Sequence, residues 1–146
     1  MTVYGMLPPS EAFPKARAAV LQALEIDERS GKSHDMLAII KWLYDWDGAG
    51  AEAEFRRGHV LDPNVDDFAY GTFLAAKGRM ADAISEFERT VSVNPGKVTT
   101  HLFFASVLAD AGRLDDALHE AQTYADRSPV LGHMTLGSLY LRMGKL

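Results

Sequence analysis

Residues 78–95 read GRMADAISEFERTVSVNP, and residues 112–129 read GRLDDALHEAQTYADRSP. The two stretches align without a gap at a spacing of 34 residues. The shared landmarks are Gly78 with Gly112, Ala83 with Ala117, and Pro95 with Pro129. Self-similarity at a fixed period of this length is typical of stacked repeats, because each unit buries its apolar face only against its neighbours.

The register continues on both sides of these stretches. Upstream, Phe55 precedes Phe87 by 32 residues, and Pro63 precedes Pro95 by the same interval. Downstream, residues 144–146 repeat the glycine, basic and apolar residues that begin at Gly78. The chain therefore reads as a single array. We divide it into three repeats at about 33–63, 64–96 and 97–129, with partial repeats at about 1–30 and 130–146.

Each repeat reads as a pair of helices, called A and B in chain order. In residues 64–96, Asn64 can cap helix A, and Asp66 and Asp67 would lie in its first turn near the positive end of the helix dipole. Gly78 is suited to end helix A in the left-handed conformation, and Pro95 cannot continue helix B. No segment alternates as a strand does, so we predict an all-α fold. The expected helices span about 14–26, 34–46, 49–61, 65–77, 80–93, 98–111, 114–127 and 131–143.

The composition narrows the classes of function. The chain has 146 residues, of which 47% are hydrophobic and 24% are charged, as in an ordinary soluble domain. Its formal net charge of -5 does not attract a phosphate backbone, so we expect no direct nucleic-acid partner. There is no Cys in the sequence, which excludes disulfides, thiolate metal sites and thiol chemistry.

The sequence carries no signal for a membrane. Residues 1–10 have neither a basic segment nor an apolar run of the kind found in signal peptides. The apolar stretches are far shorter than the roughly 18 residues that a spanning helix needs. We therefore expect a cytoplasmic protein without a membrane partner.

The repeated residues resemble the tetratricopeptide repeat (TPR) family, whose period is 34 residues. Leu136, Gly137 and Tyr140 match the family pattern of helix A, and the glycine, alanine and proline landmarks match its turn and helix B. The resemblance implies a right-handed α-solenoid of antiparallel helix hairpins. Its structural repeat positions in this chain would be Gly71, Gly78, Ala83, Phe87, Pro95, Gly112, Ala117, Pro129, Gly137 and Tyr140.

A narrower resemblance involves residues 8–16, 42–47, 51–57 and 61–64. They look like the TPR regions that lie C-terminal to bacterial winged-helix transcriptional regulators, adenylate cyclase-like proteins and some kinases. In those proteins the repeats are interaction or sensing arrays. The resemblance implies that this chain is the interaction array of a bacterial regulatory or signalling protein.

The two ends of the array are incomplete in the sequence. The first expected helix reads as a helix B without its helix A, and the last helix is apolar on more than one side. A repeat stack normally ends in a helix with a polar outer face. The chain is therefore either a fragment of a longer array or a protein whose terminal helices pack against another copy, as in a homodimer.

The aromatic and titratable residues have structural explanations. We expect Trp42 to fill the inter-helix core and Trp46 to pack in the turn, the alternative being a stacking platform for a ligand. His101 and His133 occupy equivalent repeat positions, but no cluster of three or four zinc ligands is present. Asp115 and Asp116 suit the start of a helix. We expect no metal, no cofactor and no catalytic activity.

The resemblance also implies a concave groove lined by the A helices. The expected groove residues are Met36, Ile40, Leu43, Phe68, Thr72, Leu102, Ser106, Met134, Ser138 and Leu141. TPR domains that capture a C-terminal carboxylate use basic or amide residues at such positions. Met36, Phe68 and Leu102 cannot donate a hydrogen bond to a carboxylate, so the sequence argues against such a clamp.

An apolar groove is suited to an amphipathic helix or an extended apolar peptide, and methionine adapts to different shapes. We therefore predict a protein–protein interaction module that binds a protein or peptide partner. A free-standing chaperone-like TPR protein and a self-associating module, with the groove filled by a second copy, are the alternatives.

Overall fold

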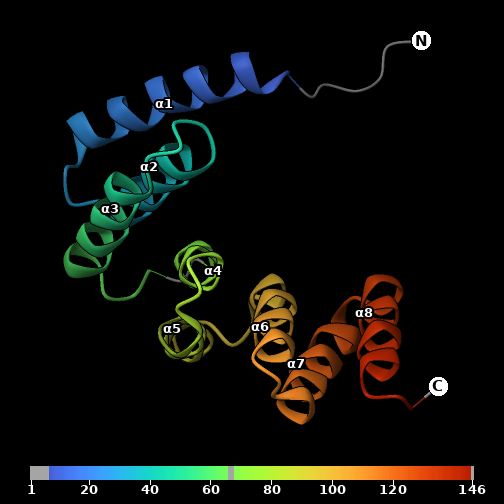
Figure 1. The fold of residues 1–146 in the computed structure, drawn as a ribbon. Helices are drawn as coiled ribbons and strands as arrows, with labels where there is room; N and C mark the ends of the chain where they lie inside the picture. The colour runs from blue at the N-terminus through green and yellow to red at the C-terminus, as the bar shows by residue number, and fades with distance from the viewer. Residues whose placement is uncertain (1–6, 66–67, 146) are drawn as a thin grey trace. The chain divides into compact units, whose positions relative to one another are not determined.

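The computed structural model describes residues 7–65 and 68–145. These residues form eight α-helices and no strand (Figure 1). The prediction of an all-α fold is therefore confirmed. The chain divides into two compact units, Met1–Val65 and Asp66–Leu146, and each is described by itself. Within the described residues, no helix has both the length and the hydropathy that a membrane span requires.

The first unit contains α1 (Pro9–Ile26), α2 (Gly31–Leu43) and α3 (Gly48–Leu61). Side-chain caps start two of these helices: Ser30 accepts a hydrogen bond from the Ser33 amide at 3.3 Å, and Asp47 accepts one from the Gly50 amide at 2.8 Å. Helices α2 and α3 form a hairpin, and α1 packs on α2. Phe55 of α3 is completely buried in this unit.

The second unit contains α4 (Ala69–Ala76), α5 (Met80–Val93), α6 (Val98–Asp110), α7 (Leu114–Arg127) and α8 (Pro129–Arg142). Helix α4 pairs with α5, α6 pairs with α7, and α8 packs on α7. Helix α6 also contacts α4 and α8, so the first helices of successive hairpins are neighbours. Four helix-B side chains at matching repeat positions are completely buried, namely Ala83, Phe87, Ala117 and Ala121.

Helix α4 begins later than expected. It starts at Ala69, with Phe68 at the N-cap, so the predicted cap at Asn64 is wrong. Instead, the Asn64 amide donates to the Asp62 carboxylate at 3.0 Å, in a turn that keeps Asn64 outside the helix. Asp66 and Asp67 lie outside the described residues. Helix α1 begins at Pro9, earlier than the sequence predicted, and contains Pro14 in its interior.

Left-handed backbone follows the ends of three helices, namely α4, α6 and α8. Gly78, Gly112 and Gly144 have φ angles of 75°, 80° and 66°. After α2 the corresponding residue is Trp46, whose φ is 58°, and it is the one non-glycine residue with a positive φ among those described. Its side chain is 87% exposed, so the prediction that Trp46 packs in the turn is wrong, whereas Trp42 is half-buried.

Replacing this tryptophan should stabilise the first unit. Left-handed backbone costs a non-glycine residue roughly 1–2 kcal/mol, and glycine removes that cost while losing more chain entropy on folding. We expect Trp46→Gly to raise the free energy of unfolding by up to about 1 kcal/mol, measured by urea denaturation. Gly112→Ala, at the matching turn, should lower it. A lower stability of Trp46→Gly would contradict this account of the turn.

A buried histidine links the two helices of the third repeat. His101 of α6 is 5% exposed. Its Nδ1 lies 2.6 Å from a carboxylate oxygen of Glu120 on α7, and its Nε2 donates to the Pro95 carbonyl at 3.1 Å. The ring therefore connects helix A, helix B and the preceding turn, and the contacts satisfy polar atoms that would otherwise be buried without partners.

The same arrangement recurs in the first unit. His34 Nδ1 lies 2.8 Å from Glu54 of α3, and His34 Nε2 donates to the Glu28 carbonyl at 3.1 Å. Lys41 also donates to Glu54, at 2.7 Å. Burial acts to raise the pKa of Glu54, but the hydrogen bonds from Lys41 and His34 outweigh it, and the pKa is lowered below 4.5. Glu54 is consequently ionised at neutral pH.

Candidate peptide-binding groove

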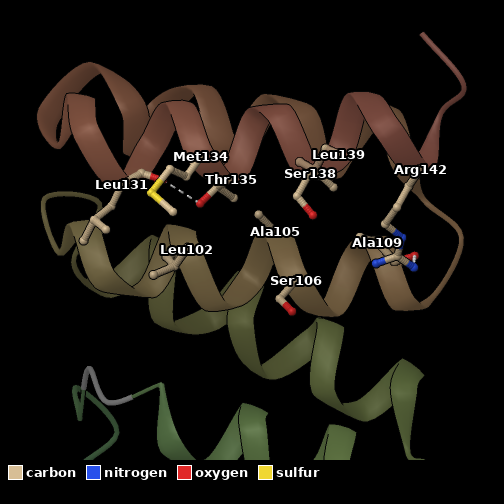
Figure 2. Close-up of a pocket in the computed structure, with 10 residues that line it drawn as sticks. All are labelled: Leu102, Ala105, Ser106, Ala109, Leu131, Met134, Thr135, Ser138, Leu139 and Arg142. Atoms are coloured by element: carbon tan, nitrogen blue, oxygen red, sulfur yellow. Dashed lines mark hydrogen bonds between the residues drawn. The ribbon is translucent and has the colours of Figure 1, made fainter. Parts of the chain in front are cut away.

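Helices α6 and α8 form the walls of a cavity of about 400 Å³ in the second unit. Figure 2 shows the side chains of both helices around it. The α6 wall consists of Leu102, Ala105, Ser106 and Ala109. The α8 wall consists of Leu131, Met134, Thr135, Ser138, Leu139 and Arg142. We call this set of residues the α6–α8 groove.

Helical spacing explains why these residues share one surface. Leu102 and Ser106 are four residues apart on α6, as are Met134 and Ser138 on α8, and residues four apart lie on the same face of a helix. Leu131 and Met134 remain 55% and 68% exposed. The groove therefore offers apolar side chains that a binding partner can cover.

The positive charge of Arg142 is already engaged at one end of the groove. Its guanidinium donates to the Asp110 carboxylate at 3.1 Å and to the Ala109 carbonyl at 2.9 Å. These acceptors lie at the C-terminal end of α6, where a cation is favourable. Because Arg142 has these partners, it is poorly placed to recruit a carboxylate ligand. The remaining polar groups of the groove are hydroxyls, and Thr135 donates to the Leu131 carbonyl of its own helix at 3.0 Å (Figure 2).

Four of the ten expected groove residues meet in this cavity, namely Leu102, Ser106, Met134 and Ser138. Leu141 of α8 is 66% exposed but lies outside the cavity lining. The Phe68 ring stacks on Phe103 with ring centroids 4.3 Å apart. The hydroxyl of Thr72 donates to the Phe68 carbonyl at 3.0 Å.

The other three expected groove residues belong to α2 in the first unit. Met36 and Leu43 are 44% and 49% exposed, so both can face a partner. Ile40 is 1% exposed and is a core residue. Ile40 therefore does not line a groove, because its side chain is already covered by the first unit itself.

Six lining residues are not among the ten expected groove residues, namely Ala105, Ala109, Leu131, Thr135, Leu139 and Arg142. Ala105, Thr135 and Leu139 lie beside the expected positions on the same helices and are not themselves groove positions of the family pattern. Arg142 could not be placed, since its role depends on contacts with residues 109 and 110 far away in the sequence. A basic residue in the last turn of α8 was the one available signal.

A second hollow of about 360 Å³ lies over α5, α6 and α7. Three of its charged residues, Arg113, Asp116 and Glu120, already have partners. Arg113 donates to Asp116 at 2.7 Å, and Glu120 holds His101. Because these charges are compensated within the unit, the α6–α8 groove is the stronger candidate for ligand binding.

The histidines at equivalent repeat positions do not come together. His101 is buried against Glu120, whereas His133 is exposed and contacts the Pro129 carbonyl of its own helix. Across residues 7–65 and 68–145, no three His, Asp or Glu side chains are grouped so that they could hold a metal ion.

Comparisons with known proteins agree with the repeat pattern. No family model matches the chain. A TPR repeat-containing thioredoxin, TTL4 of Arabidopsis thaliana, is 34% identical over 77 residues, which are 51% of this chain and 11% of that protein. The chain thus spans about a ninth of the length of this relative.

Two solved structures share the fold. MamA superimposes with a TM-score of 0.74 at 16% identity, over 98% of this chain and 88% of the other. YrrB, described as a TPR protein with an unusual peptide-binding site, superimposes with a TM-score of 0.67 at 18% identity, over 93% and 72%. The chain therefore has the helical-hairpin fold of TPR proteins, which confirms the predicted fold class.

Proposed function

We propose that the chain is a non-catalytic protein-interaction module that binds an apolar peptide or amphipathic helix in the α6–α8 groove. The observation that carries the proposal is the groove itself, a hollow whose walls are apolar side chains and hydroxyls and whose single cation, Arg142, has partners. A groove of this chemistry favours burial of apolar side chains over capture of a charged terminus. The peptide-binding site of YrrB adds support by analogy of fold.

A charge placed in the groove should abolish binding. A library of random peptides displayed on phage can be selected against the immobilised protein, and the enriched peptides should be rich in apolar residues. We expect Leu102→Glu to weaken a selected peptide at least about tenfold, because the peptide must then bury a carboxylate without a partner. Fluorescence anisotropy measures the affinity, and circular dichroism checks that helicity is retained.

Two further variants control this experiment. Ser85→Glu adds the same charge to an exposed position of α5 and should bind the peptide like the wild type. Ser106→Glu charges an exposed groove residue, so it tests the groove if Leu102→Glu loses helicity. Unchanged peptide binding by both groove variants would contradict the proposal.

The sequence is the basis of our proposal for the type of protein that contains this module and for its location. We propose that the two units belong to one repeat array of a bacterial regulatory or signalling protein, acting in the cytoplasm without direct contact with nucleic acid or membrane. The net charge of -5 supports the absence of nucleic-acid binding. The alternatives are a free-standing chaperone-like protein, which would hold a partner segment in the same groove, and a homodimer formed through the terminal helices.

A further inference from the structure

Helix α8 occupies the position of a helix A. In the described part of the chain, no helix B packs on it as α5 packs on α4. In α4, a Cβ at Gly71 would lie 2.7 Å from the ring of Phe87, because that ring fits against the glycine. Gly137 is the matching residue of α8, and a Cβ there would meet no atom of another helix within 4 Å. The position that receives the helix-B aromatic ring in the second repeat is therefore open in α8.

Two neighbours of Gly137 are less covered than the matching residues of the third repeat. His133 matches His101, which is 5% exposed beneath Glu120, but His133 itself is exposed. Tyr140 is half-exposed, whereas the matching Leu108 is 1% exposed. His133, Gly137 and Tyr140 recur at helical spacing on one side of α8, opposite the groove residues Leu131, Met134 and Ser138. We call these three residues the α8 notch.

Helix α1 occupies the position of a helix B, and in the described part of the chain no preceding helix A pairs with it. Its register follows from the turn after it, because the Glu28 carbonyl accepts from His34 just as the Pro95 carbonyl accepts from His101. Counting back from these turns aligns three residues of α1, Ala16, Val20 and Ala23, with three of α5, Ala83, Phe87 and Thr90. The three α5 residues are at most 1% exposed, whereas α1 has no buried residue.

The face of α1 is suited to close approach by another helix. Ala16, Ala19 and Ala23 are small, and small side chains allow two helices to approach each other closely. The helix carries two acidic and two basic residues, so α8 and its Arg142 meet no net repulsion. Val20 would stand opposite Gly137, as Phe87 stands against Gly71.

We propose that α1 of a second copy docks in the α8 notch, so that the two helices form one composite repeat. The exposed face of α1 and the α8 notch are both present on the same chain, so α1 of one copy can cover α8 of another. The contact is head to tail, so it leaves one α1 and one α8 free and continues into a ring or an open filament. The α6–α8 groove lies on the other side of α8 and stays accessible, so this inference does not depend on peptide binding.

Two variants, each of which blocks one of the two docking surfaces, test the proposed self-association. Gly137→Leu fills the notch, and Ala19→Arg places a long cation on the exposed face of α1, opposite His133. By sedimentation velocity, we expect the mass of the wild type to increase with concentration and each variant alone to stay monomeric. An equimolar mixture of the two variants should form a heterodimer and stop there, since only one intact pair of ends remains.

A variant that should strengthen self-association tests how the residues of α1 align with those of α8. In both complete histidine bridges, the glutamate precedes the central helix-B residue by one position, as Glu120 precedes Ala121. Ala19 holds this position in α1. We expect Ala19→Glu to tighten self-association about tenfold by giving His133 a carboxylate partner, and Ala19→Glu with His133→Ala to lose the gain.

Several results would overturn the proposal. A wild type that stays monomeric at the highest concentration reached would do so, as would Ala19→Arg assembling like the wild type, which would indicate pairing of α8 with α8. Leu102→Glu should assemble normally, so loss of peptide binding and loss of self-association are distinguishable.

Discussion

Phe87→Ala should lower the free energy of unfolding of the second unit by about 3–5 kcal/mol, because it removes a completely buried ring and leaves a cavity. The ring touches the helix-A glycine, Gly71, and stacks on Phe104 of α6 with centroids 5.3 Å apart. It therefore joins one hairpin to the next. A loss of this size is a large share of the roughly 5–15 kcal/mol that stabilises a typical domain.

The measurement is urea denaturation followed by circular dichroism, with Phe103→Ala as the control. Phe103 also stacks on another ring, that of Phe68, but it is half-exposed. Its removal should cost roughly 1 kcal/mol, the usual contribution of an aromatic pair. Equal losses of unfolding free energy in the two variants would contradict the claim that Phe87 joins one hairpin to the next.

Gly71→Leu should destabilise the second unit by at least about 2 kcal/mol, since overpacking a filled core forces the surrounding structure to move. A Cβ at this position would lie 2.7 Å from the Phe87 ring, and the ring is itself buried on all sides. Leucine is the better helix former by almost 1 kcal/mol, so the loss reflects packing and not helix propensity.

Gly137→Leu is the matched control, because the same substitution at the same repeat position of α8 meets open space. In dilute solution it should unfold no more easily than the wild type. Phe87→Ala should also reduce the cost of Gly71→Leu, since it empties the space that the leucine needs. Additive losses in the double variant would contradict direct contact between the two positions.

The repeat landmarks predicted the hairpins because they have local causes. Gly78 and Gly112 take the left-handed backbone that ends a helix, and Ala83 and Ala117 are completely buried where helices A and B meet. These requirements recur once per repeat and are therefore visible as a period in the sequence. The antiparallel pairing follows from the short connections between the helices.

The predictions for Trp46 and Asn64 were wrong because the repeats differ from one another at these two positions. Trp46 occupies the left-handed position that glycine holds elsewhere, and its side chain extends into solvent. Propensity alone would not place a tryptophan there. Asn64 was a plausible cap, but the turn uses its amide locally and α4 starts five residues later.

The groove was only partly predictable. Family spacing identified Leu102, Ser106, Met134 and Ser138, which line one cavity, but the same spacing also selected Ile40, which is buried. Spacing gives the face of a helix and not whether a neighbour covers it. The partners of the buried histidines were missed too, although His34 and His101 are each followed by a glutamate 20 or 19 residues later.

The most direct test of the central claim is a nuclear magnetic resonance titration of the labelled protein with a peptide selected from the library. If the α6–α8 groove is the binding site, the signals of Leu102, Ser106, Met134 and Ser138 will shift together and saturate, while those of exposed helix-B residues such as Ser85 and Gln122 stay in place. Shifts confined to the hollow over α5, α6 and α7 would contradict the account.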